Sequence, residues 1–444
     1  MKVDRLPFDP GPAAWDAILP AADRYSSLDQ NITADWLVIG AGFAGLSAAR
    51  RLRQLHPTDR IVVLEARRIA EGPAGRNSGF MIDLPHNLAS SNYAGALEED
   101  RIQTGMNRHA INFAKAVANE FGFSAETVAA TGKINAAATQ KGMAHNQDYA
   151  RHLAILGEPH ELFDAQQMKD LCGSSYYGQG LYTPGTAMLQ PALYVRGLAG
   201  GLSMQGVEIL ENSPVISLEK TGVDWKAETT QGSVSTPKII LAVNGHAQSF
   251  GLFKRRLMHI TLYASMTKGL SAEANKALGG ESKWAFTPAD PLGTTVRKIS
   301  GIGGTRIVVR NRFTWSPSRQ VSPARIKSIA KVHDRSFQAR FPSLKDIGME
   351  YRWGGLLCLS MNNVAAFGEV DEALFSACCQ NGLGTAKGTL SGLLAAEQAS
   401  GVGSEFLDHL LSADAPKKLP PEPFSSIGAN AYMRWGEYRA GREL

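Results

Sequence analysis

The glycine pattern of residues 40–45, which reads G-x-G-x-x-G, constrains the fold of this chain more than any other feature. It directly follows the apolar run 36–39, and a helical pattern continues from it to residue 55. A second apolar run covers residues 60–65. A short buried strand, a helix and another short strand form a βαβ unit with parallel strands. The sequence therefore predicts an α/β layer built on a parallel sheet.

This glycine spacing is typical of a dinucleotide site. The first glycine permits a tight turn, the second lets backbone approach a pyrophosphate, and the third lets the helix pack on the strand. The start of the helix offers free N–H groups and a partial positive charge to that pyrophosphate. Glu65 lies about twenty residues after Gly45, where a carboxylate binds ribose hydroxyls and would repel a 2′-phosphate. FAD and NAD both remain possible. The predicted contact residues are Gly40, Gly42, Phe43, Ala44, Gly45, Glu65, Ala66 and Arg67.

A second loop of small residues follows within ten residues of the second strand, at 71–80. An NAD enzyme has no need of it, whereas a flavoprotein does, because backbone must come close to the isoalloxazine across the end of the sheet. With this loop the chain resembles the D-amino-acid oxidase and glycine oxidase superfamily of FAD enzymes, and most closely its γ-glutamylputrescine oxidase-like branch. The resemblance implies contacts from Gly75, Arg76, Asn77, Ser78 and Gly79.

The resemblance continues to about residue 402. Residues 353–368 are similar to the closing strand of that branch, and the run 356–367 within them is predicted to be one strand. Residues 381–392 are similar to its last flavin motif. A helix that begins there would direct its positive end at the reduced flavin. Weaker matches in the middle of the chain imply contacts from Val215, which is predicted to begin a strand over 215–219, and from Gly245. In the last motif the implied contacts are Gly382, Leu383, Gly384, Thr385, Ala386 and Lys387.

Two departures from the family pattern bear on function. Leu357 stands where glycine oxidase-like enzymes place an arginine that grips the α-carboxylate, and leucine cannot donate hydrogen bonds to a carboxylate. The positions at which relatives link flavin through cysteine or histidine hold Gly355 and Arg76 here, with Cys358 three residues from the first. We therefore expect FAD to be bound non-covalently.

The resemblance implies oxidation of a C–N bond by hydride transfer to flavin N5, which leaves an imine that hydrolyses. The expected substrate is a small amine, and oxygen is the expected acceptor. An amino-acid or N-methyl-amino-acid oxidase or dehydrogenase, and a non-catalytic FAD-binding subunit, are the alternatives.

The catalytic candidates are His259 and Lys387. Lys387 is one residue from the family's lysine, and an exposed helix lysine explains it equally well. His259 lies on an alternating strand, for which a buried structural histidine is the alternative. His86, after the second loop, is a further candidate beside the flavin.

The fold class predicted from these patterns is α/β, with a Rossmann-like FAD-binding domain of the glutathione-reductase type and a second, mainly antiparallel substrate domain. Residues 1–33 are predicted to form an N-terminal arm, and residues 411–444 a C-terminal tail. The FAD-binding domain is predicted to be discontinuous, over 34–85, 190–256 and 350–410. Residues 86–189 and 257–349 are predicted to form the substrate domain.

Composition excludes several other classes. There are 46 basic and 41 acidic residues, and no basic tract is interleaved with aromatic residues, so nucleic acid is not an expected partner. The four cysteines form no C-x-x-C pair, which favours a reducing cytoplasm over a disulfide framework or a metal site. The apolar runs are too short to span a bilayer, and residues 1–15 lack a signal-peptide pattern. We expect a cytoplasmic protein, and its oligomeric state stays open.

Overall fold

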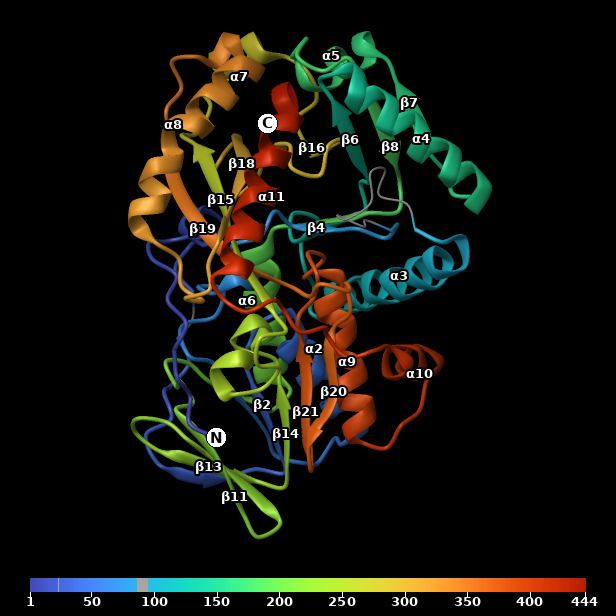
Figure 1. Ribbon diagram of the computed structural model, residues 1–444. Coiled ribbons are helices and arrows are strands. Elements are labelled where there is room, and N and C mark those ends of the chain that lie inside the picture. Colours follow the sequence, from blue (N-terminus) through green and yellow to red (C-terminus); the bar gives the residue numbers. More distant parts are fainter. Residues whose placement is uncertain (23, 86–94) are drawn as a thin grey trace.

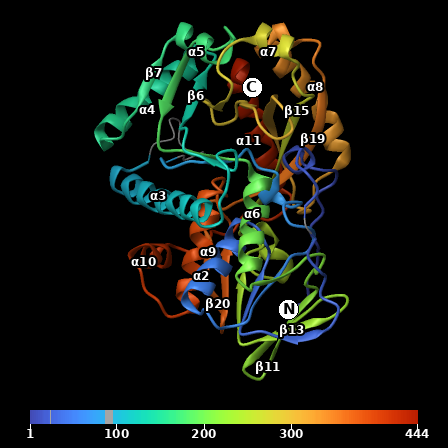
Figure 2. The same ribbon diagram turned by 180° about the vertical axis from the view of Figure 1, so that it is seen from behind.

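The computed structural model describes residues 1–22, 24–85 and 95–444, and it consists of two parts stacked along the long axis of the molecule (Figure 1). The lower part in that view is built on a six-stranded sheet and the upper part on an eight-stranded sheet. Seen from behind, α3 (Leu97–Glu120) crosses the boundary between the two parts (Figure 2).

The six-stranded sheet contains the βαβ unit predicted from the glycine pattern. Its strands are parallel apart from the last pair. In spatial order they are β10 (Glu208–Leu210), β3 (Ile61–Leu64), β2 (Trp36–Ile39), β14 (Lys238–Leu241), β21 (Leu374–Cys378) and β20 (Ala366–Asp371).

Side chains that alternate along β2 bury its two faces in different cores. Trp36 and Val38 pack with the helices, whereas Leu37 and Ile39 pack toward a small four-stranded sheet. Because successive side chains in a strand point to opposite faces, a run of four apolar residues is what a sheet covered on both faces requires. The helices of this part are α2 (Phe43–Leu55), α6 (Pro191–Met204), α9 (Ala386–Ala399) and α10 (Glu405–Ser412). The small sheet comprises β1 (Asn31–Thr33), β13 (Ser233–Thr236), β12 (Asp224–Glu228) and β11 (Ser217–Thr221).

The eight-stranded sheet is mainly antiparallel, as predicted, with one parallel pair between β16 and β6. Its order is β19 (Met349–Leu359), β15 (Met258–Thr267), β18 (Arg306–Trp315), β17 (Thr295–Ile299), β16 (Trp284–Pro288), β6 (Lys133–Ala137), β8 (Gln179–Thr183) and β7 (Glu161–Phe163). Its helices are α4 (Gln140–Leu156), α5 (Ala165–Cys172), α7 (Ala272–Leu278), α8 (Pro323–Arg340) and α11 (Phe424–Ala440).

The remaining elements are short. A three-stranded sheet joins β4 (Phe80–Met81), β9 (Ala187–Leu189) and β5 (Val128–Ala129). The short helices are α1 (Ala14–Ala17), η1 (Pro73–Gly75), η2 (Asn244–Phe250), η3 (Pro342–Leu344) and η4 (Gly441–Glu443). In the described ranges no helix is long and apolar enough to cross a membrane.

Three features differ from the sequence-based expectations. The strand-like run predicted over 356–367 is two strands, β19 and β20, with a turn between them. β19 pairs with β15 in the eight-stranded sheet, although it was grouped with the FAD-binding residues 350–410. Val215, expected on a strand, lies just before β11. The domain boundaries as a whole stay a proposal.

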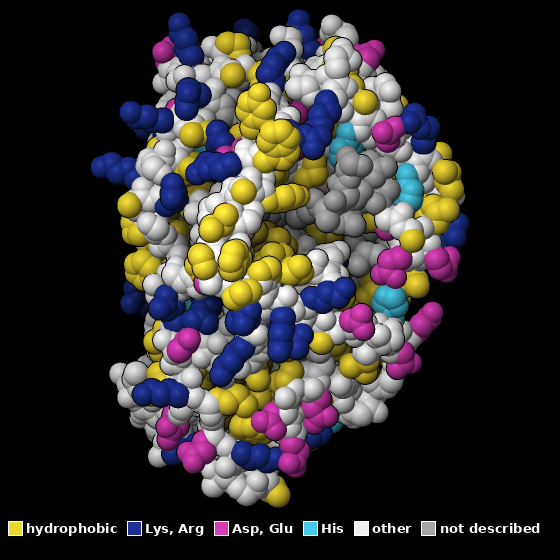
Figure 3. All heavy atoms as spheres, in the orientation of Figure 1, with side chains coloured by type: hydrophobic (Ala, Val, Ile, Leu, Met, Phe, Trp, Pro, Cys, Tyr) yellow, Lys and Arg dark blue, Asp and Glu magenta, His cyan; other side chains and the backbone are white. Residues whose placement is uncertain are grey.

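Both chain ends pack against the body of the protein. The dark blue N-terminal segment in Figure 1 links the two parts, since Val3 N–H donates to Ile216 O in the lower part and Val321 N–H donates to Phe8 O in the upper part. The predicted tail contains α11, which packs on β18, with large apolar side chains on its outer face (Figure 3). The C-terminal Leu444 carbonyl accepts a hydrogen bond from Asn311 Nδ2 (3.2 Å).

Candidate active site

One cavity extends from the carboxyl ends of β2 and β3 to the inner face of the eight-stranded sheet. Ligands of open α/β sheets bind at the carboxyl ends of the strands, so the cavity begins where the fold predicts. Of the residues predicted from sequence, these line it: Gly40, Gly42, Phe43, Ala44, Glu65, Ala66, Arg67, Arg76, Asn77, Ser78, Gly79, Val215, Gly245, His259, Gly382, Leu383, Gly384 and Thr385.

The three glycines of the first motif serve different purposes. Gly40 has a positive φ of 102°, and a Cβ there would lie 2.7 Å from Ala242 O. A Cβ on Gly45 would lie 1.7 Å from Gly40 O, so close packing of α2 on the turn requires glycine. A Cβ on Gly42 would meet only Ala74 Cβ, at an ordinary 3.5 Å. The protein's own packing therefore does not require glycine at position 42. The absence of a side chain there leaves room for a ligand to approach the protein backbone.

Glu65 directly follows β3, and its side chain contacts the dinucleotide loop at residues 40–45. One of its carboxylate oxygens accepts from Ala41 N–H (2.9 Å) and the other from Arg67 N–H (3.0 Å). Each oxygen retains a further lone pair, and the side chain lines the cavity. Burial raises the pKa of Glu65, and the two backbone hydrogen bonds oppose that shift. Ser213 N–H donates to Glu65 O, which brings the segment that carries Val215 beside it.

Arg297 of β17 binds a backbone carbonyl of the second glycine loop, and it is not among the residues predicted from sequence. Its Nη1 donates to Ser78 O (2.5 Å) and to Leu189 O (3.0 Å). The guanidinium lies over the rings of Trp15 (5.0 Å) and Phe80 (5.7 Å). Burial lowers the pKa of Arg297 to about 9. No sequence motif marks this residue, because only the tertiary fold brings β17 behind residues 75–79.

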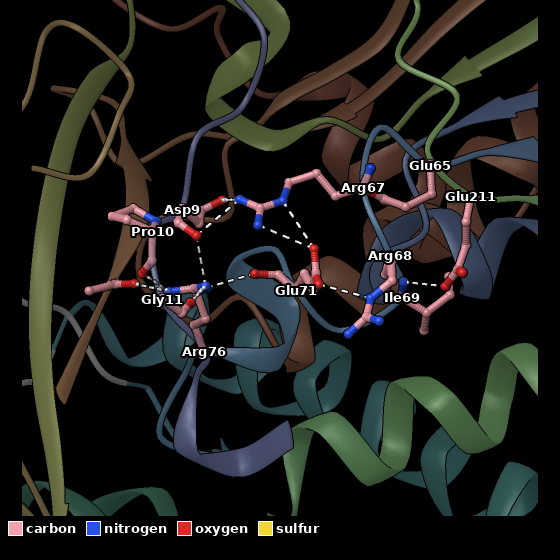
Figure 4. A network of polar contacts seen from close by, with 11 residues as sticks. Asp9, Pro10, Gly11, Glu65, Arg67, Arg68, Ile69, Glu71, Arg76 and Glu211 are labelled. Carbon is pink, nitrogen blue, oxygen red and sulfur yellow. Dashed lines mark hydrogen bonds and ion pairs between the residues drawn. The ribbon is translucent and has the colours of Figure 1, made fainter. Parts of the chain in front are cut away.

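Arg76 fastens the N-terminal arm to the same loop (Figure 4). Its guanidinium donates to the carbonyls of Gly11 (2.6 Å), Asp9 (2.9 Å) and Gly354 (3.1 Å). Arg67 Nη1 donates to Asp9 O as well (3.0 Å), so two arginines of the site grip one stretch of the arm. The structure therefore connects residues 1–12, the second loop and β19 through one side chain.

Two helices begin at the cavity. A Cβ on Gly392 of α9 would lie 1.9 Å from Ala44 O of α2, so that glycine permits the two helices to pack closely, with both starts at the cavity. Among the described residues, no side chain caps the first N–H groups of either helix. A Cβ on Gly384 would meet nothing within 4 Å. The open positions of Gly42 and Gly384 and the two helix starts fit an anionic dinucleotide that reaches from Glu65 to α9.

The other end of the cavity is formed by β15, β18 and β19. Tyr263, Phe313 and Leu357 line it together with Arg310, whose Nη2 donates to Thr295 Oγ1 (3.0 Å). Arg306 and Arg312 of the same strand form ion pairs with Glu350 and Glu437, and neither is among the residues that line the cavity.

His259 is buried between the two sheets. Its Nε2 lies 3.0 Å from Gly245 O, where the carbonyl accepts the hydrogen bond. Burial lowers the pKa of His259, and the Gly245 contact opposes that shift. Nearby His246 also lines the cavity, and burial lowers its pKa to about 4. Both rings are therefore neutral near neutral pH.

Four predicted residues do not line the cavity: Gly45, Gly75, Ala386 and Lys387. Lys387 of α9 is partly buried; burial lowers its pKa to about 8, and the negative charge of Glu99 opposes that shift. The candidate His86 lies outside the described residues. Within the described ranges, no cluster of three or more His, Cys, Asp or Glu side chains could hold a metal ion.

The structure joins a parallel sheet with a dinucleotide loop to an antiparallel sheet across one cavity. This arrangement is that of a two-part, nucleotide-dependent enzyme. The chain belongs to the FAD dependent oxidoreductase family, whose family model matches residues 35–398. FAD is the cofactor of that family.

Sequence relatives match nearly the whole chain. A protein named "Probable oxidoreductase OrdL" from Rhizobium meliloti is 24% identical over 90% of this chain and 91% of its own length. A protein named "Gamma-glutamylputrescine oxidoreductase" from Escherichia coli is 23% identical over 91% of both chains.

Solved structures share the fold. Glycine oxidase from Geobacillus kaustophilus superposes with a TM-score of 0.70 at 15% identity, over 88% of this chain and all of the other. L-proline dehydrogenase from P. horikoshii gives a TM-score of 0.67 at 16% identity, over 86% and 97%.

Proposed function

We propose that this protein oxidises the C–N bond of a small amine with FAD, and that oxygen is the electron acceptor. One observation carries the proposal: a single cavity connects the dinucleotide loops with a partly apolar wall on the eight-stranded sheet. When bound, FAD supplies the group that accepts a hydride from the carbon next to nitrogen. A relative whose name contains an amine, γ-glutamylputrescine, supports the substrate class.

The side chains of this chain would position the amine and exclude water. Tyr263, Phe313 and Leu357 offer apolar surface beside the reacting carbon, and a dry site strengthens each polar contact. Since burial lowers the pKa of His259, its ring is neutral and does not repel a cationic amine that enters. No strong base is needed if the amine binds in its neutral form.

We propose further that FAD is held without a covalent bond. Cys358 is the one thiol among the described residues that line the cavity. Burial raises its pKa well above the ordinary thiol value, so the thiol stays protonated and is a poor nucleophile. Arg76, at the position of a linking histidine in relatives, has its guanidinium engaged by backbone carbonyls.

An amino-acid or N-methyl-amino-acid oxidase is the second candidate, and Arg310 is the observation that favours it. Its guanidinium lines the substrate end of the cavity on a different strand from Leu357. A carboxylate could therefore be bound from β18 rather than from β19. Arg310 could also bind a carboxylate that is farther from the amine than the α position. One panel of substrates can therefore test both candidates.

The test is hydrogen peroxide formation by the purified yellow protein with a panel of compounds. The panel contains alkyl amines, amines with a distant carboxylate, α-amino acids and N-methyl amino acids. Turnover of amines without an α-carboxylate supports the proposal. Turnover restricted to α-amino acids supports the second candidate. Bound flavin that these compounds bleach without forming peroxide indicates a dehydrogenase, and bound flavin that none of them bleaches supports a non-catalytic subunit.

A further inference from the structure

The outer face of α11 carries large apolar side chains that the fold leaves in solvent. The exposed fractions are 66% for Phe424, 62% for Ile427, 64% for Tyr432, 61% for Trp435 and 79% for Tyr438. Their spacing of three to five residues places them on one side of the helix, over a length of about 21 Å. We call these five residues the α11 aromatic face, and Figure 3 shows them as a yellow group on the surface.

The α11 aromatic face is not the side of the helix that packs on the rest of the protein. The opposite side of α11 is packed, with Met433, Glu437 and Ala440 buried. Arg312 Nη1 contacts Glu437 Oε2 (2.7 Å), and Trp315 Nε1 donates to Ser426 Oγ (3.0 Å). The helix is therefore held on β18 by its inner side, and aromatic side chains on the outer side are available to a partner.

Cations lie at both ends of the α11 aromatic face. At its start, Arg255 Nη2 donates to Leu419 O (3.1 Å), which brings the 254–256 segment beside the residues that lead into α11. Exposed cations at that end are Lys254, Arg255, Lys417 and Lys418, and at the other end Arg439 and Arg442, whereas Arg434 is paired with Glu437 (3.0 Å). The exposed acids of the same segments are Asp414 and Glu422, so positive charge predominates; in Figure 3 dark blue side chains border the yellow group.

We propose that the α11 aromatic face docks this protein on an anionic lipid surface. Tryptophan and tyrosine favour the boundary between lipid head groups and hydrocarbon, where the ring is apolar and its edge remains hydrated. Lysine and arginine beside them are attracted to anionic head groups. Both features occur together here, on a helix already formed and fixed to the protein.

Charge complementarity favours lipid over a second copy of the chain. In a two-fold symmetric pair the same patch meets itself, so each cationic end faces a cationic end, whether the helices run parallel or antiparallel. That arrangement repels, whereas an anionic bilayer compensates the cations of both ends at once. The inference is independent of the proposed function, because α11 lies outside the residues that line the cavity.

The test is sedimentation of the FAD-loaded, full-length protein with vesicles at low ionic strength. Vesicles of phosphatidylcholine with phosphatidylglycerol are compared with phosphatidylcholine alone. The double variant Trp435→Ser/Tyr438→Ser removes two side chains of the face, and Lys417→Glu/Lys418→Glu reverses charge at its start. Val223→Ser, which removes an apolar side chain that is 81% exposed on another surface, is the matched control. FAD content and thermal unfolding verify that every variant is folded.

We expect the parent and Val223→Ser to sediment with the anionic vesicles, and both double variants to bind about tenfold more weakly. Binding should fall as salt is raised, and neutral vesicles should retain little protein. Equal binding by the parent and the Trp435 and Tyr438 variant would overturn the proposal, as would no binding by the parent. A dimer that the parent forms without lipid and that the same variant loses would show that a second copy covers the face.

Discussion

At the scale of single residues, the same glycine motif contains two kinds of requirement. Gly40 and Gly45 are required by the protein's own backbone, whereas nothing in the protein excludes a side chain at Gly42. The sequence spacing identifies all three and cannot tell them apart, because the distinction depends on what surrounds each Cβ. We therefore expect Gly42 to be required only when the cofactor is bound.

This distinction predicts opposite outcomes for two matched substitutions. Gly42→Ala should lose FAD while its free energy of unfolding falls by no more than about 1 kcal/mol, the cost of alanine at a helix N-cap. Gly45→Ala should lower the free energy of unfolding by about 1–3 kcal/mol or more, because the new Cβ overlaps Gly40 O. Flavin absorbance per protein and urea unfolding of the FAD-free forms measure both effects. Full FAD retention in Gly42→Ala would contradict the assignment.

Glu65 predicts a pH dependence of FAD retention. Its ordinary pKa of 4.5 is raised by burial, so the carboxylate is protonated at a higher pH than in the unfolded chain. A protonated carboxyl loses acceptor capacity for ribose hydroxyls, so FAD retention should be complete above the raised pKa and fall as pH decreases through it. In the FAD-free protein the sign is opposite: the folded state binds the proton more tightly, so the free energy of unfolding rises as pH falls from the raised pKa toward 4.5.

The isosteric variant Glu65→Gln checks this dependence by equilibrium dialysis of FAD across pH. Its FAD affinity should be lower by about 1.5–3 kcal/mol at neutral pH and should vary little as pH decreases. A variant that retains the parent's affinity and pH profile would show that the carboxylate does not bind the ribose.

Lys387 gives a residue-scale prediction about oxygen. Because Lys387 is not among the described residues that line the cavity, we expect Lys387→Met to leave both half-reactions unchanged. A cation next to the reacting group would instead accelerate reoxidation by stabilising superoxide. Stopped-flow reduction by amine and reoxidation by oxygen, measured separately, decide between these, and slow reoxidation alone would place Lys387 at the reaction.

At the scale of elements, periodicity predicted those with a clear pattern. The elements β2, α2 and β3 were predicted to within about a residue. The run 356–367 was predicted as one strand because its apolar residues continue through a turn that only the pairing of β19 and β20 reveals. The C-terminal helix α11 was missed because apolar residues on its outer face hide the usual amphipathic period. Arg297 was missed as a site residue because strand order, not sequence, brings it to the second glycine loop. Arg310 lines the cavity, and alternation along β18 alone does not show which arginine of that strand would do so.

The arm residues 1–12 depend on Arg76, which predicts the effect of a conservative change there. Arg76→Lys keeps the charge but loses the guanidinium fork that donates to Gly11 O, Asp9 O and Gly354 O. We expect faster proteolysis of the arm and a free energy of unfolding lower by about 2–4 kcal/mol. Arg68→Lys, shortly before that loop, where the side chain is exposed and pairs with Glu71, should match the parent in both measurements. An arm equally resistant in both variants would show that Arg76 does not hold it.

At the scale of the whole molecule, the two sheets contribute different kinds of residues to the lining of one cavity. The parallel sheet presents glycine turns and helix starts, and the antiparallel sheet presents Tyr263, Phe313, Arg310 and Leu357. The dinucleotide half could be predicted from sequence because its chemistry is encoded in short, contiguous motifs. The substrate half could not, because its residues come from three strands that are far apart in the chain.

Leu357 predicts which substrates the whole cavity rejects. Glycine, D-alanine and sarcosine, whose carboxylate lies next to the reacting carbon, should be turned over poorly compared with longer primary or secondary amines. The reason is that Leu357, where glycine oxidase-like relatives place an arginine, offers no side-chain donor for an α-carboxylate. Steady-state kcat/KM values measured across the panel test this. Glycine turnover comparable to that of the best amine would assign the carboxylate contact to Arg310, and Arg310→Met would then abolish it.

The most direct measurement of the central claim is the flavin spectrum of the purified protein after anaerobic mixing with amines. An amine substrate should bleach the oxidised flavin band, the band should return when oxygen is admitted, and acid precipitation should release the FAD into solution. A flavin that stays oxidised with every amine and amino acid tested would contradict an amine-oxidising function, even with FAD bound as described.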